Sequence, residues 1–240
     1  MELCFLGRGA GFNPGEGSTA AFFIDNGELF LIDSGESVFR ALLERKVLDS
    51  VSVLNLFITH THSDHTGSIG SLILYAFMAK KIPVNIIIDD NTSYASSLRV
   101  LFGIYGLTEN MYRFAGAEEF DEKYSLFTRV RYVKTRHCNE LDTCALLFET
   151  DQGLVFYTGD IRDPAPVIEL IASGRQIDRI FVDSNNDPTP NIHHISLHQL
   201  NDIIPASLKS KVFCMHFSNS QCIADAQAYG FSIVTVSMPF

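Results

Sequence analysis

The alternation of apolar and polar residues along the chain predicts strands and helices in a regular order. In the first half, strand-like apolar runs cover 2–6, 19–24, 28–32, 51–58 and 84–88, and apolar residues at helical spacing cover 36–45 and 68–80. Asn26-Gly27 separates two of these runs and is typical of a type I′ hairpin turn. The stretch 91–117 is mixed, and it predicts helix and loop.

The second half of the chain repeats this order. Strands are predicted at 127–133, 144–149, 154–158, 180–182, 212–215 and 231–236, and helices at 164–173, 196–203 and 220–228. Hairpins followed by strand–helix units favour two sheets packed face to face with helices outside. The expected fold is therefore α/β (α+β), a four-layer αββα sandwich. Since no linker-like segment interrupts the 240 residues, we expect one domain over 1–240.

Composition and charge limit the partners and the compartment that we expect for this chain. The formal net charge of −10 disfavours a long nucleic acid as partner, because an acidic surface repels its phosphates. The five cysteines form no C-x-x-C pair, which is typical of a reducing compartment. The longest apolar stretch, 72–79, is far shorter than the ~20 residues of a membrane span, and no basic residues precede the apolar start. We expect a cytoplasmic protein without membrane contact.

The strongest chemical signal is His60-x-His62-x-Asp64-His65, directly after the predicted strand 51–58. Imidazole and carboxylate ligands suit zinc, manganese or iron, and the absence of thiolate disfavours a purely structural site. Alternate residues of an extended turn point in opposite directions. We therefore expect His60 and His62 to bind one ion, and Asp64 and His65 a second.

Two ions need more ligands than this segment offers. Other candidates again follow strands: His137 comes after 127–133, Asp160 after 154–158, and His216 after 212–215. Gly159 would let the backbone beside Asp160 approach its neighbours closely. Asp160 is expected to bridge, with one oxygen toward each ion. Two divalent ions ~3.5–4 Å apart act as a hydrolytic clamp and lower the pKa of bound water.

The segment His60 to His65 resembles the H-x-H-x-D-H signature of the metallo-β-lactamase superfamily, and His137, Asp160 and His216 resemble its later motifs in the same order. The resemblance spans Glu2 to Val236. Asp33, in Leu-Ile-Asp-Ser-Gly, is similar to the early aspartate of that superfamily. The resemblance implies that Asp33 orients a ligand histidine.

Within the superfamily, the chain resembles ribonuclease Z and its smaller phosphodiesterase relatives. Residues 1–10 are similar to their first strand and glycine loop, and His194-Ile-Ser196 is similar to a motif whose histidine contacts the scissile phosphate. The resemblance implies Asp64, His194 and Asp183 as catalytic residues, with Asp183 orienting His194. It also implies substrate contacts from His193 and Ser196, with His193 a rival of His194, and a homodimer.

Two departures from ribonuclease Z restrict the substrate. The short segment between His137 and Asp160 leaves no room for an arm that grips transfer RNA, and Asp183 stands where that family has a His-Glu pair. We therefore expect a dinuclear metal-dependent hydrolase, with zinc first among the ions, acting as a phosphodiesterase on a small phosphorylated substrate: a cyclic nucleotide or short oligonucleotide. The alternatives are hydrolysis of a thioester, lactone or β-lactam, a ribonuclease Z-like endonuclease, and a protein that only sequesters a nucleotide.

Overall fold

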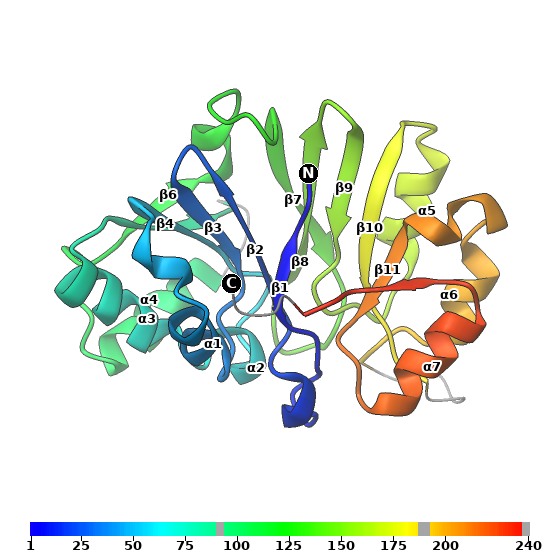
Figure 1. Cartoon of the computed structure of the whole chain (residues 1–240), viewed down its shortest axis with the longest axis horizontal. Coiled ribbons are helices and arrows are strands. Elements are labelled where there is room, and N and C mark those ends of the chain that lie inside the picture. Colours follow the sequence, from blue (N-terminus) through cyan, green and yellow to red (C-terminus); the bar gives the residue numbers. More distant parts are fainter. Residues whose placement is uncertain (90–93, 187–192, 237–240) are drawn as a thin grey trace.

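Two six-stranded sheets face each other, and helices cover their outer surfaces (Figure 1). The computed structural model describes residues 1–89, 94–186 and 193–236. The first sheet has the order β1 (Cys4–Gly7), β2 (Ala20–Asp25), β3 (Glu28–Ile32), β4 (Val53–Phe57), β5 (Val84–Ile88) and β6 (Arg113–Gly116). The second has the order β12 (Ser232–Ile233), β11 (Val212–Met215), β10 (Ile177–Asp183), β9 (Gly153–Tyr157), β8 (Thr143–Thr150) and β7 (Arg129–Thr135).

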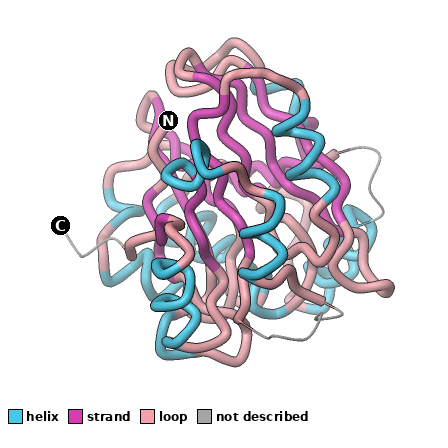
Figure 2. Tube along the Cα trace, turned by 90° about the vertical axis from the view of Figure 1, so that its right-hand side faces the viewer, coloured by secondary structure: helices cyan, strands magenta, loops and turns pink. Residues whose placement is uncertain are grey.

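Helices flank each sheet in chain order. The first half carries α1 (Val38–Glu44), α2 (Ser63–Thr66), α3 (Ile69–Tyr75) and α4 (Tyr94–Ile104). The second half carries α5 (Ala165–Ala172), α6 (Leu197–Ile203) and α7 (Ser220–Ala228). Short 3₁₀- or π-helical segments complete the set: η1 (Pro14–Glu16), η2 (Val47–Asp49), η3 (Ala76–Lys80), η4 (Ala117–Phe120) and η5 (Ala206–Lys211). Viewed from the side, the strands run through the interior and the helical coils lie around them (Figure 2).

The two halves share one topology, as the sequence pattern predicted. In each, the first three strands pair antiparallel, and the third begins a parallel set of four. The hairpin between β2 and β3 turns at Asn26 and Gly27, whose φ angles of 53° and 78° are those of the predicted type I′ turn. The predicted four-layer αββα sandwich is confirmed.

Aromatic side chains fill the space between the sheets. The rings of Phe23 and Phe30 stack at 4.8 Å, and Phe148 of the second sheet meets Phe23 edge-on at 5.9 Å. Such contacts add about 0.5–1.5 kcal/mol per pair to the gain from burial. Separate apolar clusters join each sheet to its own helices. The sandwich is thus a rigid frame for the loops at the strand ends.

Some element boundaries differ from the sequence prediction. Strand β6 lies within the stretch predicted as helix and loop, and the helix expected over 68–80 is an α-helix that continues as one π-helical turn, η3. The last strand is shorter than predicted, at Ser232–Ile233. In the described ranges, no helix has the length and apolarity needed to cross a bilayer.

Candidate metal centre

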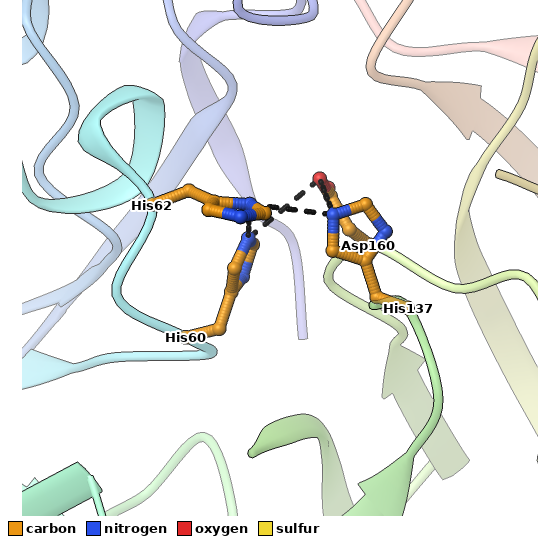
Figure 3. A group of neighbouring side chains, drawn as sticks. All are labelled: His60, His62, His137 and Asp160. Atoms are coloured by element: carbon orange, nitrogen blue, oxygen red, sulfur yellow. Dashed lines mark hydrogen bonds and ion pairs between the residues drawn. The ribbon is translucent and has the colours of Figure 1, made fainter. Parts of the chain in front are cut away.

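Four side chains from three loops form a first ligand cluster (Figure 3). His60 and His62 follow β4, His137 follows β7, and Asp160 follows β9. His62 Nδ1 lies 3.0 Å from His60 Nε2 and 3.3 Å from His137 Nε2. Asp160 Oδ2 lies 3.6 Å from His137 Nε2 and 3.8 Å from His60 Nε2. Ligands 2.0–2.1 Å from a tetrahedral ion lie about 3.3 Å apart, so this spacing suits a metal ion.

A second cluster contains Asp64, His65, Asp160 and His216. His216 Nε2 lies 3.3 Å from both Asp64 Oδ2 and Asp160 Oδ1, and His65 Nε2 lies 3.3 Å from the same Asp160 oxygen. Within the described residues, His65 Nε2 and Asp160 Oδ1 are buried and accept or donate no hydrogen bond. Buried polar atoms without partners are costly, and a cation between them would satisfy both. The two clusters share only Asp160, which turns one oxygen to each.

The local backbone at the second cluster differs from the prediction. Ser63–Thr66 is a helical turn, α2, not an extended segment. Asp64 and His65 still reach the second cluster, because α2 is clamped against the loop after β3: Ser34 N–H donates to the carbonyl of His65 at 2.7 Å. A Cβ added to Gly35 would lie 1.8 Å from the carbonyl oxygen of Asp64, so only glycine fits there.

Asp33 holds His65 in orientation. It is fully buried, its Oδ2 lies 2.8 Å from His65 Nδ1, and its two oxygens also accept the backbone N–H and the hydroxyl of Thr59. The Thr59 hydroxyl in turn lies 3.1 Å from His60 Nδ1. Asp33 adopts a φ of 65°, in the left-handed region that is uncommon for residues other than glycine. Thr59 was not among the residues predicted from the sequence, although it directly precedes His60.

Asp183, at the end of β10, is fully buried and serves two histidines. Its Oδ2 lies 2.7 Å from His194 Nδ1, and its Oδ1 lies 3.4 Å from His216 Nδ1. The neighbouring His193 is exposed, and its backbone carbonyl lies 2.7 Å from His137 Nδ1. The His194 side chain therefore pairs with Asp183, whereas His193 contacts His137 through its backbone carbonyl, and the side chains of both line the cavity described below.

Ser196 differs from the expectation of a substrate contact. Its side chain is buried, and it accepts a hydrogen bond from the backbone N–H of Gln199 at the start of α6. The Gln199 side chain accepts from the backbone N–H of Ser196, which completes a capping box. The motif around His194 therefore fixes a helix start beside the centre, since Ser196 does not line the cavity.

A cavity of about 500 Å³ opens onto both clusters. This volume is within the range typical of small-molecule sites. The cavity is lined by Ala10, Gly11, Phe12, Glu36, His62, Ser63, Asp64, His137, Cys138, Glu140, Asp160, His193, His194 and His216. Among these described lining residues there is no lysine or arginine, so the positive charge for a bound anion would come from metal ions and protonated histidine.

The two clusters differ in protonation when no metal is bound. Burial lowers the pKa of His60 well below its ordinary value, and it lowers the pKa of His137 too. Burial acts the same way on His65 and His216, but nearby carboxylates outweigh it: the pKa of His65 lies well above its ordinary value, and that of His216 rises to about 10. The first cluster therefore offers neutral imidazoles, whereas ions at the second must displace protons.

The chain is similar in sequence to two kinds of known protein. It is 27% identical over 243 residues to the anti-Pycsar protein Apyc1 of Bacillus phage 010DV004, a match that covers 92% of this chain and 90% of that protein. A ribonuclease Z of Methanococcus maripaludis is 36% identical over 88 residues, which are 36% of this chain but only 28% of the ribonuclease.

Solved structures agree on the fold. The metallo-β-lactamase fold protein YhfI of Bacillus subtilis superposes with a TM-score of 0.72 at 16% identity, covering 99% of this chain and 96% of that one. The family model of the anti-Pycsar protein Apyc1 matches residues 1–235. The chain therefore belongs to the family of the anti-Pycsar protein Apyc1, within the metallo-β-lactamase superfamily of metal-dependent hydrolases.

Proposed function

We propose that this protein is a dinuclear metal-dependent phosphodiesterase that hydrolyses a cyclic mononucleotide. The observation that carries the proposal is the position of Asp160 between two ligand clusters, in a cavity that His194 also lines. His60, His62 and His137 would hold one ion, and Asp64, His65 and His216 the other. Two such ions would neutralise the phosphate and activate a water molecule for attack on phosphorus.

His194 is suited to move the proton that hydrolysis requires. Water adds across one P–O bond, so that its hydroxyl joins phosphorus and a proton goes to the leaving ribose oxygen. Because His194 Nδ1 is bonded to Asp183, the proton would leave from Nε2. A buried carboxylate that fixes the ring and its tautomer makes this transfer efficient. Asp183 also lies beside His216, so it positions the proton donor relative to the second cluster.

The cavity favours a mononucleotide over an oligonucleotide or structured RNA. One phosphate can be neutralised by the ions, but a second would face Glu36 and Glu140, because the described lining offers no basic side chain. The segment between His137 and Asp160 is taken up by the hairpin β8–β9, which leaves no arm for transfer RNA. The match to part of a ribonuclease Z and the membership in the Apyc1 family both support phosphodiester chemistry.

Three finer points belong to the same proposal. Zinc is the proposed ion, since imidazole and carboxylate ligands at this spacing suit it, and manganese and iron belong in the reconstitution panel. A cytoplasmic homodimer is proposed from the resemblance to the phosphodiesterase branch. Light scattering of the purified chain tests the dimer.

The test is hydrolysis of 3′,5′-cyclic nucleotides and bis-(p-nitrophenyl) phosphate by metal-reconstituted protein. We expect Asp160→Ala to be inactive. His194→Ala should keep its metal and lose about 10²- to 10⁴-fold in rate. The matched control is His198→Ala, because His198 is an exposed histidine on α6 whose side chain lies 3.7 Å from Asp202 and does not line the cavity. Protein that binds metal, leaves the diesters intact and hydrolyses a thioester or lactone would show the proposal to be wrong.

A further inference from the structure

Phe12 is the most exposed large apolar side chain in the described ranges. Its relative exposure is 103%, against 75% for the next, Ile104. A phenylalanine can bury 150–250 Å² of surface, so leaving one in water forgoes a large hydrophobic gain. Single exposed apolar residues are common on protein surfaces, but this one belongs to the lining of the cavity that opens onto both ligand clusters.

The turn that carries Phe12 is firmly held. The N–H of Asn13 donates to the carbonyl of Ala10 at 2.8 Å, which closes a β-turn with Gly11 and Phe12 at its centre. The N–H of Ala10 and the side-chain amide of Asn13 both donate to the carbonyl of Phe217, at 3.0 and 2.9 Å. The backbone under Phe12 is therefore fixed, although its side chain is fully exposed.

These bonds also fix Phe12 relative to the metal centre. Phe217 directly follows the ligand His216, and a Cβ added to Gly11 would lie 3.0 Å from Asp64 Oδ2. The turn thus lies against one ligand and is bonded to the segment of another. Phe12 belongs to the lining of the same cavity as both clusters.

The cavity has two chemically different ends. The clusters around Asp160 suit an anionic phosphate once metal is bound, whereas the rim presents an aromatic ring and carboxylates. The part of the substrate beyond its phosphate should therefore carry no second negative charge and should present a surface that can pack on the ring. A nucleobase meets this requirement, and aromatic side chains are the usual platforms on which proteins stack unpaired bases.

We propose that Phe12 is the platform on which the nucleobase of the substrate stacks, and that it thereby makes the enzyme selective for nucleotides over other small phosphodiesters. This rests on the proposed function. Phe12 touches the substrate far from the reacting phosphorus, so it contributes equally to ground and transition states. Its loss should raise KM and leave kcat unchanged.

The experiment compares a 3′,5′-cyclic nucleotide with an analogue that lacks the base, 1-O-methylribose 3′,5′-cyclic phosphate. We expect Phe12→Ala to lower kcat/KM for the nucleotide by about 5- to 100-fold, through KM, and to leave kcat/KM for the abasic analogue unchanged. Phe12→Tyr should keep the wild-type values, since it keeps the ring. The matched control is Ile24→Ala, which truncates another exposed apolar side chain, at 42% exposure on β2.

Binding can be followed without turnover. The chain contains no tryptophan, so Phe12→Trp would introduce a single tryptophan at the platform, whose emission can be excited apart from that of the tyrosines. In a metal-loaded His194→Ala background, the cyclic nucleotide should quench this fluorescence and the abasic analogue should not. Metal content of each variant, measured alongside, should equal that of wild type.

Two results would overturn the platform while leaving the proposed function intact: equal losses of kcat/KM for both compounds in Phe12→Ala, or unchanged values for both. Equal losses for both compounds, together with a changed oligomeric state in light scattering, would assign Phe12 to a contact with a second chain. If the wild type hydrolyses neither compound, the proposed function fails instead. Fluorescence that the nucleotide does not quench would then refute the platform as well.

Discussion

Asp33→Asn tests whether the second cluster depends on the buried carboxylate behind it. The carboxylate of Asp33 accepts three hydrogen bonds of 2.8 Å, from Thr59 N–H, the Thr59 hydroxyl and His65 Nδ1. An asparagine of the same shape can keep one oxygen toward the backbone N–H of Thr59. Its NH₂ group then faces His65 Nδ1, and it favours the tautomer that carries its proton on Nε2, the atom that must bind metal.

The expected loss of metal affinity and of stability follows from these hydrogen bonds. Loss of such a partner typically weakens metal binding by about 10- to 100-fold, and we expect this loss only for the ion at the second cluster. The first cluster should keep its affinity, because Thr59 still supports His60. Donors left without acceptors in the core cost about 1–3 kcal/mol each, so the free energy of unfolding of metal-free protein should fall by about 2–4 kcal/mol.

Asp25→Asn is the matched control for this loss of stability. Asp25 is also buried, and it accepts hydrogen bonds from Leu126 N–H and the Ser125 hydroxyl at 2.7 and 2.8 Å, but it lies at the far end of β2. It should lower the free energy of unfolding and leave both metal affinities unchanged. The assay is a competition titration against a chromophoric chelator, with urea unfolding of the metal-free proteins. Equal weakening of both ions in Asp33→Asn, or weakening in Asp25→Asn, would refute the reasoning.

Three further predictions concern the two ligand clusters and the loop after β3 that supports them. Asp160→Ala should reduce bound metal from two equivalents to less than one in metal analysis after dialysis, because both clusters lose a ligand; retention of two ions would show that Asp160 does not bridge. Carboxylates raise the pKa values of His65 and His216, so protons compete with metal for the second cluster at higher pH than for the first. Dialysis at falling pH should therefore remove the ion at the second cluster first. Simultaneous loss of both ions would contradict this. Gly35→Ala should lower the thermal unfolding midpoint, because its Cβ would clash with the carbonyl oxygen of Asp64 at a cost of about 1–3 kcal/mol. The control Gly103→Ala should leave the midpoint unchanged, because its Cβ would meet nothing within 4 Å. Equal midpoints for the two variants would show that the loop at Gly35 relaxes.

The sequence predicted which side chains converge in the two candidate ligand clusters, because these side chains are tied to strand ends. His60, His137, Asp160 and His216 each follow a buried apolar run, and such runs are the most reliable sequence signal for strands. Strands in a sandwich bring their ends together, so residues far apart in sequence converge. Gly159 adopts a φ of 58°, and a Cβ there would lie 2.9 Å from Thr59 Cβ, which is the close approach expected beside Asp160.

Other features left weak or misleading signals. Strand β6 is only four residues long, Arg-Phe-Ala-Gly, with no alternation to mark it. The turn α2 has four residues, too few for helical periodicity to show. Ser196 was assigned to the substrate from its motif alone, yet Ser followed three residues later by Gln199 is the pattern of a helix start. Phe12 lay in a glycine-rich loop, where sequence gives no measure of exposure.

The centre depends on both halves of the chain. His60 and His62 come from the first half, and His137 and Asp160 from the second; in the other cluster Asp64 and His65 meet Asp160 and His216 in the same way. Neither sheet alone offers more than two ligands to either cluster. Each ion would therefore bind across the interface of the sheets, and its binding energy would act on their packing as well as on the substrate. The aromatic contacts between the sheets would then bear on metal binding, because they hold apart the two ligand pairs of each cluster at the distances described above.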